Sequence, residues 1–265
     1  MAAECFGNLA AIVVSRRVDF PVSSRNFLTR RKYNHPRIKT VICISHQIKK
    51  VLSPAIRDTT KLIVVHSGID LSKFSNSSNL LRTNYGLAEH IFVVGNVAAI
   101  AGHKDYFTFV NTAKVLIEAR FPVHFFIIGA DGGEQSAIEK HIQMLDLQNH
   151  ITLTGYRNDI PKLLPALDVL LFTSKEEGLG TTILDAFASR VAVVATRAGG
   201  IPEMVEHEST GMLADIGDSL ALANHVKTVL LDTHLKSRIQ ENAWRKVQEF
   251  SKENMAAGVL RVYHN

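Results

Sequence analysis

From residue 91 onward, the sequence alternates between short apolar runs and longer segments with helical spacing. The apolar runs are nearly continuous, which is typical of strands that are covered on both faces of a sheet. They lie at 91–100, 123–129, 151–155, 169–174, 191–196 and 210–214. Strands that alternate with helices in this way predict a parallel, doubly wound α/β sheet.

The segments between these strands carry apolar residues at the spacing of an amphipathic helix. In GEQSAIEKHIQMLD, for example, Ile138, Ile142 and Leu145 fall along one face, and charged residues lie elsewhere. The expected helices span 104–119, 133–146, 160–166, 181–189, 200–206 and 219–231, with a further long one at about 234–249.

The first 65 residues are organised differently. Buried strands are expected at 10–15, 40–45 and 61–70, with a helix at 46–53. Two or three strands cannot bury a sheet on their own. This part of the chain is therefore expected to be a fragment of a larger domain.

Charge is unevenly distributed along the chain, whose formal net charge is +5. Residues 1–50 contain ten Lys and Arg residues against only Glu4 and Asp19. A basic stretch of this kind is compatible with a solvated surface, with an anionic ligand or membrane surface, or with nucleic acid. Aromatic residues do not interleave the basic ones as in a stacking platform, so nucleic acid is not expected as a partner.

Cysteine content and hydropathy indicate the expected cellular location of the protein. Cys5 and Cys43 are too few for a disulfide framework or a zinc site, which favours a reducing compartment. No apolar run reaches the roughly 18–20 residues that span a bilayer, and the N-terminus lacks the basic region of a signal peptide. The expected location is the cytoplasm, and the basic N-terminal stretch is compatible with peripheral contact to the inner face of a membrane.

The most informative loop follows the expected strand 169–174. It reads SKEEGLGTTILDAF, with Glu177 ahead of two glycines and a helix that opens at Thr181. Ligands of parallel α/β sheets bind beyond the carboxyl ends of the strands, and a helix N-terminus there suits a diphosphate. Physical reasoning leaves two interpretations of Glu177 and Asp185: carboxylates that accept hydrogen bonds from sugar hydroxyls, or helix-start acids that complement the helix dipole.

Lys104 lies at the start of the helix that follows the strand 91–100. It is interpreted either as a phosphate-binding cation or as a solvated surface lysine. The loop after that strand lacks G-x-G-x-x-G, which disfavours a nicotinamide enzyme. The sequence contains no P-loop and no G-x-S-x-G elbow, and its twelve histidines show no metal-site spacing. We therefore expect no cofactor and no resident metal.

Six segments, in this order, resemble family 4 of the retaining GT-B glycosyltransferases. The likeness begins at about Val64 and runs to the C-terminus. The segments are VVHSGID (64–70), VGNVAAIAGHKD (94–105), FIIGADGGE (126–134), LTGYRNDIPKLLPALDVLLFTS (153–174), EGLGTTILDA (177–186) and AVVATRAGGIPEMVEHESTGML (192–213). The resemblance implies a GT-B fold with a remnant of a Rossmann-like acceptor-binding domain at 1–65. It further implies a Rossmann-like nucleotide-sugar-binding domain at 66–250 and a C-terminal helix at 251–265 that crosses back to the first part.

The same resemblance implies roles for individual residues. Lys104 and Glu177 would be the catalytic pair, with Lys104 on the donor diphosphate and Glu177, the first acid of an E-x7-E motif, near the transferred sugar. Asp185 would contact the ribose. The other donor-binding residues would be Gly155, Tyr156, Arg157, Ser174, Gly178, Leu179, Gly180, Thr181 and Thr182. The family works without a metal, because cations and a helix N-terminus stabilise the leaving nucleoside diphosphate.

The chain departs from the family pattern at three places. The second acid of the motif is Asp185 rather than Glu, and Ala99 stands where the family usually has an Arg that assists the Lys. On the acceptor side, Arg16 and Arg17 lie in SRRVDF, where many relatives carry a histidine near the position of Arg17.

The resemblance implies a hexosyltransferase that moves a sugar from a nucleotide-sugar donor to an acceptor with retention of anomeric configuration. The acceptor would be a sugar, a lipid-linked molecule or a lipopolysaccharide-type molecule. The alternative is a truncated or inactive nucleotide-sugar-binding protein without turnover, because of Ala99 and the short N-terminal part. A GT-B epimerase or phosphorylase is disfavoured, since no lysine-bearing segment suggests a pyridoxal phosphate site.

Overall fold

The computed structural model describes residues 10–18, 27–74 and 78–264. Two parallel sheets are present in these residues. The smaller has the order β1-β2-β3, and its strands are β1 (Ile12–Arg16), β2 (Ile38–Cys43) and β3 (Leu62–Val64). The larger has the order β6-β5-β4-β7-β8-β9, and its strands are β4 (Phe92–Val97), β5 (Val123–Ile128), β6 (Ile151–Gly155), β7 (Val169–Phe172), β8 (Ala192–Thr196) and β9 (Met212–Ala214).

The strand order of the larger sheet confirms the doubly wound α/β prediction. The chain starts at β4 in the centre, moves outward through β5 to β6, and returns to place β7 on the other side of β4. The order therefore reverses between β4 and β7. In open α/β sheets, ligands bind in the crevice beyond the carboxyl ends of the strands at this reversal.

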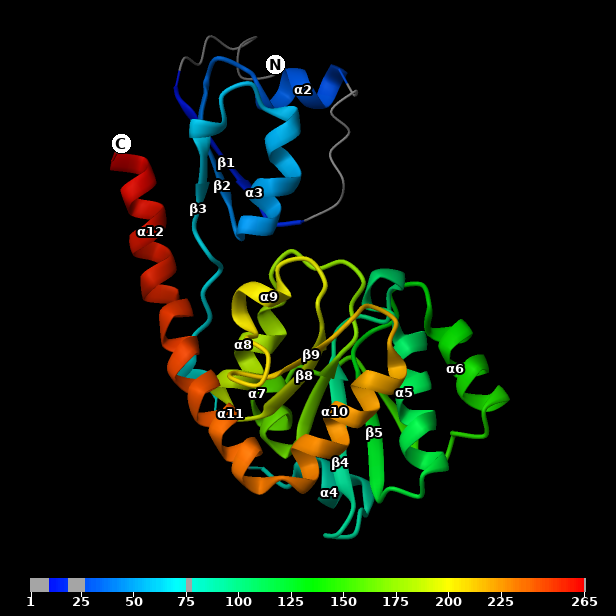
Figure 1. Cartoon of the computed structure of the whole chain (residues 1–265). Helices are drawn as coiled ribbons and strands as arrows, with labels where there is room; N and C mark the ends of the chain where they lie inside the picture. The colour runs from blue at the N-terminus through cyan, green and yellow to red at the C-terminus, as the bar shows by residue number, and fades with distance from the viewer. Residues whose placement is uncertain (1–9, 19–26, 75–77, 265) are drawn as a thin grey trace.

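Helices cover both faces of the larger sheet (Figure 1). Val93 and Val94 of β4 are both fully buried and point to opposite faces, since they belong to different apolar clusters. The helices packed on the Val94 side are α5 (Tyr106–Glu118), α6 (Gln135–Met144) and α10 (Ser219–Leu231). Those on the Val93 side are α4 (Leu80–Tyr85), α7 (Ile160–Leu163), α8 (Thr181–Ala188), α9 (Ile201–Met204) and much of α11 (Thr233–Val247). Near-continuous apolar strands are thus explained by burial on both sides.

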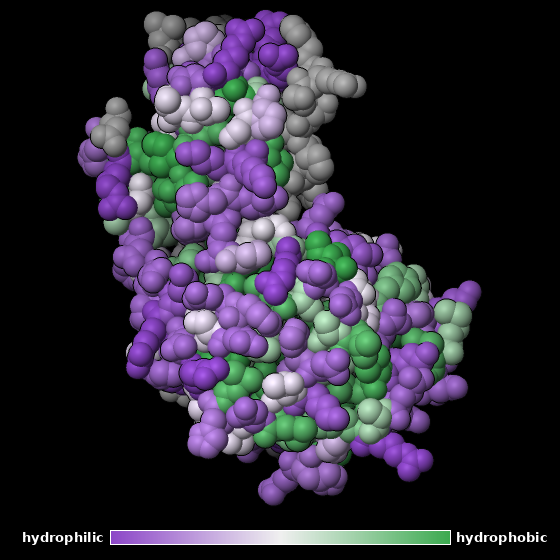
Figure 2. Space-filling model, in the orientation of Figure 1, coloured by the Kyte–Doolittle hydropathy of each residue, from purple (hydrophilic) through white to green (hydrophobic). Residues whose placement is uncertain are grey.

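The smaller sheet forms a separate unit above the larger domain in Figure 1, with helices α2 (Phe27–Tyr33) and α3 (His46–Leu52). Helix α12 (Lys252–His264) leaves the larger domain and runs beside β3. At its start, the amide of Lys252 donates to the carbonyl of Ile69 at 2.9 Å. Figure 2 shows apolar side chains on this unit beside α12, where Val13, Ile42 and Val259 help to line a cavity of about 250 Å³. The domain boundaries at 65 and 250 remain predictions.

Several elements are shorter than expected, for local reasons. The helix expected at 104–119 begins as α5 at Tyr106, because Asp105 takes a left-handed conformation (φ 50°) and its carboxylate caps the helix at Thr108. The helix expected at 160–166 divides into α7 and a 3₁₀ turn, with Pro165 in the turn. Among the described residues, none of the helices combines the length and the apolar character that crossing a bilayer requires.

Candidate functional site

The loop between β7 and α8 is held in place by hydrogen bonds from the neighbouring strand and loop. The hydroxyl of Thr196 on β8 donates to the carbonyl of Ser174 at 2.6 Å. The amide of Gly200 donates to the carbonyl of Glu177 at 2.8 Å. Thr173 and Ser174 are fully buried. The backbone that carries Glu177 is therefore fixed on both sides.

The structure brings Lys104 and Glu177 together. The ammonium of Lys104 donates to Oε2 of Glu177, and the hydroxyl of Ser174 donates to the same oxygen at 3.3 Å. Both charged side chains are about 15% exposed, and the Lys104 ammonium lies 5.1 Å from the centre of the Phe172 ring. The pair joins the loops that follow β4 and β7, so a cation and a carboxylate lie at the reversal of strand order.

Helix α8 begins at this pair without a side-chain cap. Its N-cap residue is Gly180, in a left-handed conformation (φ 87°), and among the described residues no side chain caps the helix N-terminus. The hydroxyl of Thr182 donates to the carbonyl of Val97 at 3.1 Å, which ties the start of α8 to the end of β4. An uncapped helix N-terminus offers N–H groups and a positive dipole end to an anion.

The loop after β8 packs so closely on the Glu177 segment that only glycine fits there. A Cβ atom on Gly199 would overlap the carbonyl oxygen of Glu177 and lie 2.9 Å from its amide nitrogen. Gly199 also has φ 50°, a conformation that L side chains rarely adopt.

Gly199→Ala is expected to displace Glu177 and to disable the site. The added methyl group cannot avoid backbone atoms of Glu177, and strained backbone of this kind costs about 1–3 kcal/mol. We expect sugar-transfer or donor-hydrolysis activity to fall about 100-fold or more, in line with the cost of misplacing a catalytic group. Gly217→Ala, also at positive φ but with open space around its Cβ, is the matched control, and equal losses in both variants would contradict the steric argument.

Asp185 lies one helical turn into α8 and is largely buried. Burial raises the pKa of its carboxyl group to about 6, although the positive charge of Lys73 acts to lower it. The folded chain therefore holds this proton more tightly than the unfolded chain, where the pKa is near 3.8. The free energy of unfolding falls as pH rises from about 4 to 6 and stays lower above that range.

Asp185→Asn is accordingly expected to stabilise the chain at pH 8 by about 2–3 kcal/mol, the equivalent of a shift of two pKa units. The gain should shrink toward zero as the pH falls below about 4, where the Asp185 carboxyl group becomes protonated in the unfolded chain as well as in the folded one. Urea unfolding at pH 4, 6 and 8 measures it, with the exposed Asp215→Asn as control. A difference between wild type and Asp185→Asn that does not change with pH would contradict the assigned pKa.

Gly155, Tyr156 and Arg157 lie at the end of β6, at the same sheet edge but two strands from β4. Gly155 has φ 69°, and the Tyr156 side chain projects into solvent with 76% of its surface exposed. The guanidinium of Arg157 forms two hydrogen bonds with Asp159, at 2.6 and 2.8 Å. The Tyr156 ring is therefore an exposed aromatic surface at the end of β6.

Arg16 is the last residue of β1, and Arg17 follows it. Arg16 donates to the hydroxyl of Tyr33 at 3.1 Å, and Arg17 donates to the hydroxyl of Ser67 at 3.4 Å. The carbonyl oxygen of Arg17 lies 3.0 Å from where a Cβ of Gly178 would be. The small unit thus touches the loop that carries Glu177, and Gly178 makes that approach possible.

Sequence reasoning missed Glu203 as a functional contact between the two parts of the chain. Its carboxylate accepts hydrogen bonds from the amides of His46 and Gln47, each at 2.8 Å, and contacts Nε2 of His66 at 3.1 Å. Burial alone would raise the pKa of Glu203, but the bonds from His66, Gln47 and His46 outweigh it and hold the pKa below its usual value. The contacts span 137 to 157 positions, and no local sequence signal connects them.

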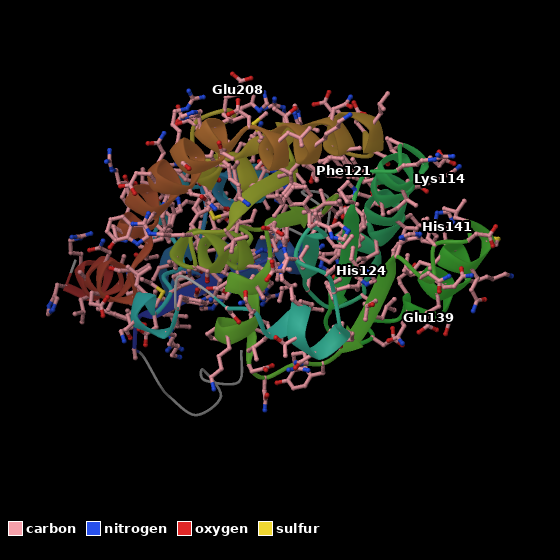
Figure 3. All side chains as sticks on the ribbon, turned by 90° about the horizontal axis from the view of Figure 1, so that it is seen from below. Lys114, Phe121, His124, Glu139, His141 and Glu208 are labelled. Atoms are coloured by element: carbon pink, nitrogen blue, oxygen red, sulfur yellow. The ribbon has the colours of Figure 1, made fainter. Side chains whose placement is uncertain are left out.

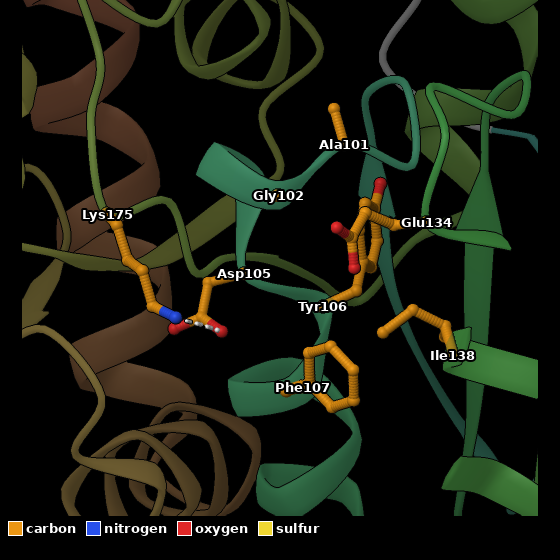
Figure 4. A pocket seen from close by; sticks show the side chains of 8 residues that line it. All are labelled: Ala101, Gly102, Asp105, Tyr106, Phe107, Glu134, Ile138 and Lys175. Carbon is orange, nitrogen blue, oxygen red and sulfur yellow. Dashed lines mark ion pairs between the residues drawn. The ribbon is translucent and has the colours of Figure 1, made fainter. Parts of the chain in front are cut away.

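A second cavity, of about 260 Å³, lies beside the loop after β4 (Figure 4). Asp105, Glu134 and Lys175 provide its charged lining. The ammonium of Lys175 lies 3.1 Å from Oδ1 of Asp105. Lys175 therefore forms an ion pair of its own, separate from the one between Lys104 and Glu177.

Other titratable groups of the larger domain lie apart from the Lys104–Glu177 pair or contact neighbouring polar side chains. Figure 3 shows Lys114, Glu139 and His141 on the outer side of the domain, where His141 contacts the amide oxygen of Asn111 at 2.9 Å. His124 contacts the hydroxyl of Thr152 at 2.8 Å, and burial lowers its pKa.

The fold and this edge define the class of protein. A parallel sheet with the strand order of dinucleotide-binding folds carries an uncapped helix N-terminus and a lysine at its point of reversal, which is the architecture of a nucleotide-binding α/β domain. Residues 77–246 match the family described as Glycosyl transferases group 1. The chain belongs to this family of glycosyltransferases, and its fold is GT-B, as the resemblance implied.

Relatives and solved structures agree with this assignment. The chain is 25% identical to N-acetyl-alpha-D-glucosaminyl L-malate synthase of Bacillus anthracis, over 85% of this chain and 59% of that protein. It is 29% identical to UDP-Gal:alpha-D-GlcNAc-diphosphoundecaprenol alpha-1,3-galactosyltransferase of Escherichia coli, over 72% and 51%. The chain thus spans between half and three fifths of these two relatives. The crystal structure of Anabaena Alr3699/HepE in complex with UDP and glucose superposes with a TM-score of 0.89 at 26% identity, covering 99% of this chain and 74% of that one.

Proposed function

We propose that the chain provides the donor site of a retaining glycosyltransferase, which moves a sugar from a nucleotide-sugar donor to an acceptor without a catalytic metal. The observation that carries this proposal is the Lys104–Glu177 pair at the uncapped start of α8. A cation and free backbone amides stabilise a leaving diphosphate, and a carboxylate beside them suits the hydroxyls or the developing charge of the sugar.

Within this proposal, Lys104 binds the donor diphosphate and turns away from Glu177 when the donor arrives. The backbone of Gly178, Leu179, Gly180 and Thr181 presents N–H groups to the sugar and the phosphates. Glu177 then contacts the transferred sugar, and the hydroxyls of Ser174 and Thr182 fix the geometry of the loop around it.

Asp185 accepts from a ribose hydroxyl in this scheme, one turn into the helix whose N-terminus binds the diphosphate. The loop Gly155–Arg157 lies by the base, for which the exposed ring of Tyr156 is a stacking surface. We propose uridine as the base. The support comes from Anabaena HepE, solved with UDP and with UDP-glucose, and from the Escherichia coli relative, whose name specifies UDP-Gal.

The acceptor approaches from the small unit, where the backbone of Arg17 lies against the loop that carries Glu177 and Arg16 precedes it at the end of β1. The names of relatives include a diphosphoundecaprenol-linked acceptor, so a lipid-linked acceptor is within the range of the family. We propose cytoplasmic action with peripheral contact to an anionic membrane through the basic N-terminal residues, and no role for nucleic acid.

A specific observation favours a second candidate, nucleotide-sugar binding without turnover. Ala99, exposed in the loop after β4, supplies no cation to assist Lys104. The loss of one charge partner from a diphosphate site costs about 2–5 kcal/mol when nothing replaces it.

Donor hydrolysis followed by proton NMR tests the proposal without a known acceptor. The chain is incubated with UDP-glucose, UDP-galactose and UDP-N-acetylglucosamine, and the first anomer released is recorded before mutarotation. Release of the α anomer with UDP supports a retaining transferase, and release of the β anomer contradicts retention. UDP binding with neither donor hydrolysis nor sugar transfer to any acceptor in a panel would favour the second candidate.

A further inference from the structure

Three side chains with metal-binding chemistry meet between the small unit and the larger domain. They are His46 at the start of α3, His66 after β3, and Glu203 on α9. One possible ligand atom from each lies within 4.8 Å of those of the other two. Nε2 of His66 is 3.1 Å from Oε2 of Glu203, and the two imidazole rings have centroids 5.8 Å apart.

Imidazole nitrogen and carboxylate oxygen are preferred ligands of Zn²⁺ and other first-row divalent ions. Two histidines and one carboxylate leave positions open for water or an exogenous ligand. We propose that His46, His66 and Glu203 bind one divalent transition-metal ion, with Zn²⁺ as the reference case. His66 and Glu203 are already at the separation that two ligands of one ion have, and a ring nitrogen of the exposed His46 lies within 4.8 Å of both.

The surroundings of the cluster hold two of the ligands in place. The Glu203 carboxylate accepts from the amides of His46 and Gln47 at 2.8 Å each, which fixes its plane. The ring of His66 packs against Phe250 with centroids 5.2 Å apart. Contacts of this kind orient metal ligands before the ion arrives and contribute to affinity.

The ion would connect three segments of the chain. His46 belongs to the small unit, His66 to the segment that links the two parts, and Glu203 to the larger domain three residues after Gly200, whose amide holds the Glu177 carbonyl. A bound ion would therefore fasten the small unit over the loop that carries Glu177. The cluster plays no part in the transfer chemistry proposed above, and the inference does not rest on that function. No resident metal was expected from the sequence, because these three residues are far apart in the chain and show no metal-site spacing. The fold brings them together.

Titration of the metal-free chain with Co²⁺, followed by visible absorption, tests the proposal. Wild type should show ligand-field bands that saturate at one equivalent and disappear when Zn²⁺ is added. His46→Ala and His66→Ala should each weaken Co²⁺ binding by about 100-fold or more, because losses outside the ligand shell already cost 10–100-fold. His234→Ala, an exposed histidine on α11, is the matched control and should bind as wild type.

Thermal unfolding provides an independent readout. Excess Zn²⁺ should raise the Tm of wild type and of His234→Ala, and leave that of His46→Ala unchanged, since a ligand stabilises only a state that binds it. His46 is exposed, so its replacement leaves the fold intact. Absence of ligand-field bands in the folded wild-type chain would overturn the proposal. So would binding that survives in His66→Ala and is lost in His225→Ala, since it would place the ion at the His207–His225 pair.

Discussion

Replacing Lys104 with alanine is expected to weaken UDP binding at least about 30-fold, the lower end of the 2–5 kcal/mol cost of removing one partner from a buried charge pair. The Lys104 ammonium is 15% exposed, and Ala99 leaves it without a cationic partner in its own loop. Donor hydrolysis should fall further, by about 10²–10³-fold, because the negative charge on the leaving diphosphate grows in the transition state. Calorimetry with UDP and initial rates of hydrolysis measure the two effects.

Lys175→Ala is the matched control for this variant. Lys175 is also close to the loop after β4, but its side chain is 53% exposed and pairs with Asp105 in the cavity of Figure 4. It should bind UDP within about twofold of wild type, as expected for an exposed surface pair. Equal losses in both variants would show that UDP responds to the general positive charge of this edge rather than to Lys104.

Replacing Glu177 with glutamine is expected to give a different result from the loss of Lys104. The carboxylate is the partner of Lys104 in the unliganded chain, so its neutralisation releases the ammonium for the diphosphate. UDP binding should stay the same or become up to about tenfold tighter, while turnover falls by about 10²–10³-fold, the usual cost of losing a preorganised electrostatic contact to the transition state. Steady-state kinetics and UDP calorimetry on the same preparation separate the two.

Glu176→Gln is the control, since Glu176 is exposed one position earlier in the same loop. It should leave both UDP binding and turnover close to wild type. If Glu177→Gln lost UDP affinity in parallel with turnover, Glu177 would be a ligand of the nucleotide and not a residue that acts on the sugar. Loss of UDP affinity in Lys104→Ala but not in Glu177→Gln is therefore the result that distinguishes the proposed site.

Much of the fold could be predicted because strand burial and strand–helix alternation are local properties of the sequence. Continuous apolar runs such as 169–174 are readable as strands covered on both sides. Topology then places the loops after β4 and β7 together, although Lys104 and Glu177 lie 73 positions apart. The resemblance to family 4 implied that the two residues share a site, but their mutual ion pair was not predicted.

Features that depend on contacts between residues far apart in the sequence could not be predicted. The hydrogen bonds from the amides of His46 and Gln47 to the Glu203 carboxylate require α9 to lie against the start of α3. Hydrophobic periodicity in the sequence does not indicate such a contact. The raised pKa of Asp185 depends on how deeply α8 is buried, which its sequence pattern does not specify. The late start of α5, at Tyr106, reflects the left-handed conformation of Asp105, which hydrophobic spacing alone does not reveal.

A crystal structure of this chain with UDP would locate the donor site. The diphosphate should lie at the start of α8, with a phosphate oxygen within hydrogen-bonding distance of the Lys104 ammonium and of the first backbone amides after Gly180. The uracil should lie beside Tyr156 and the ribose near Asp185. UDP bound elsewhere, or a site that stays empty at saturating UDP in a folded chain, would contradict the account.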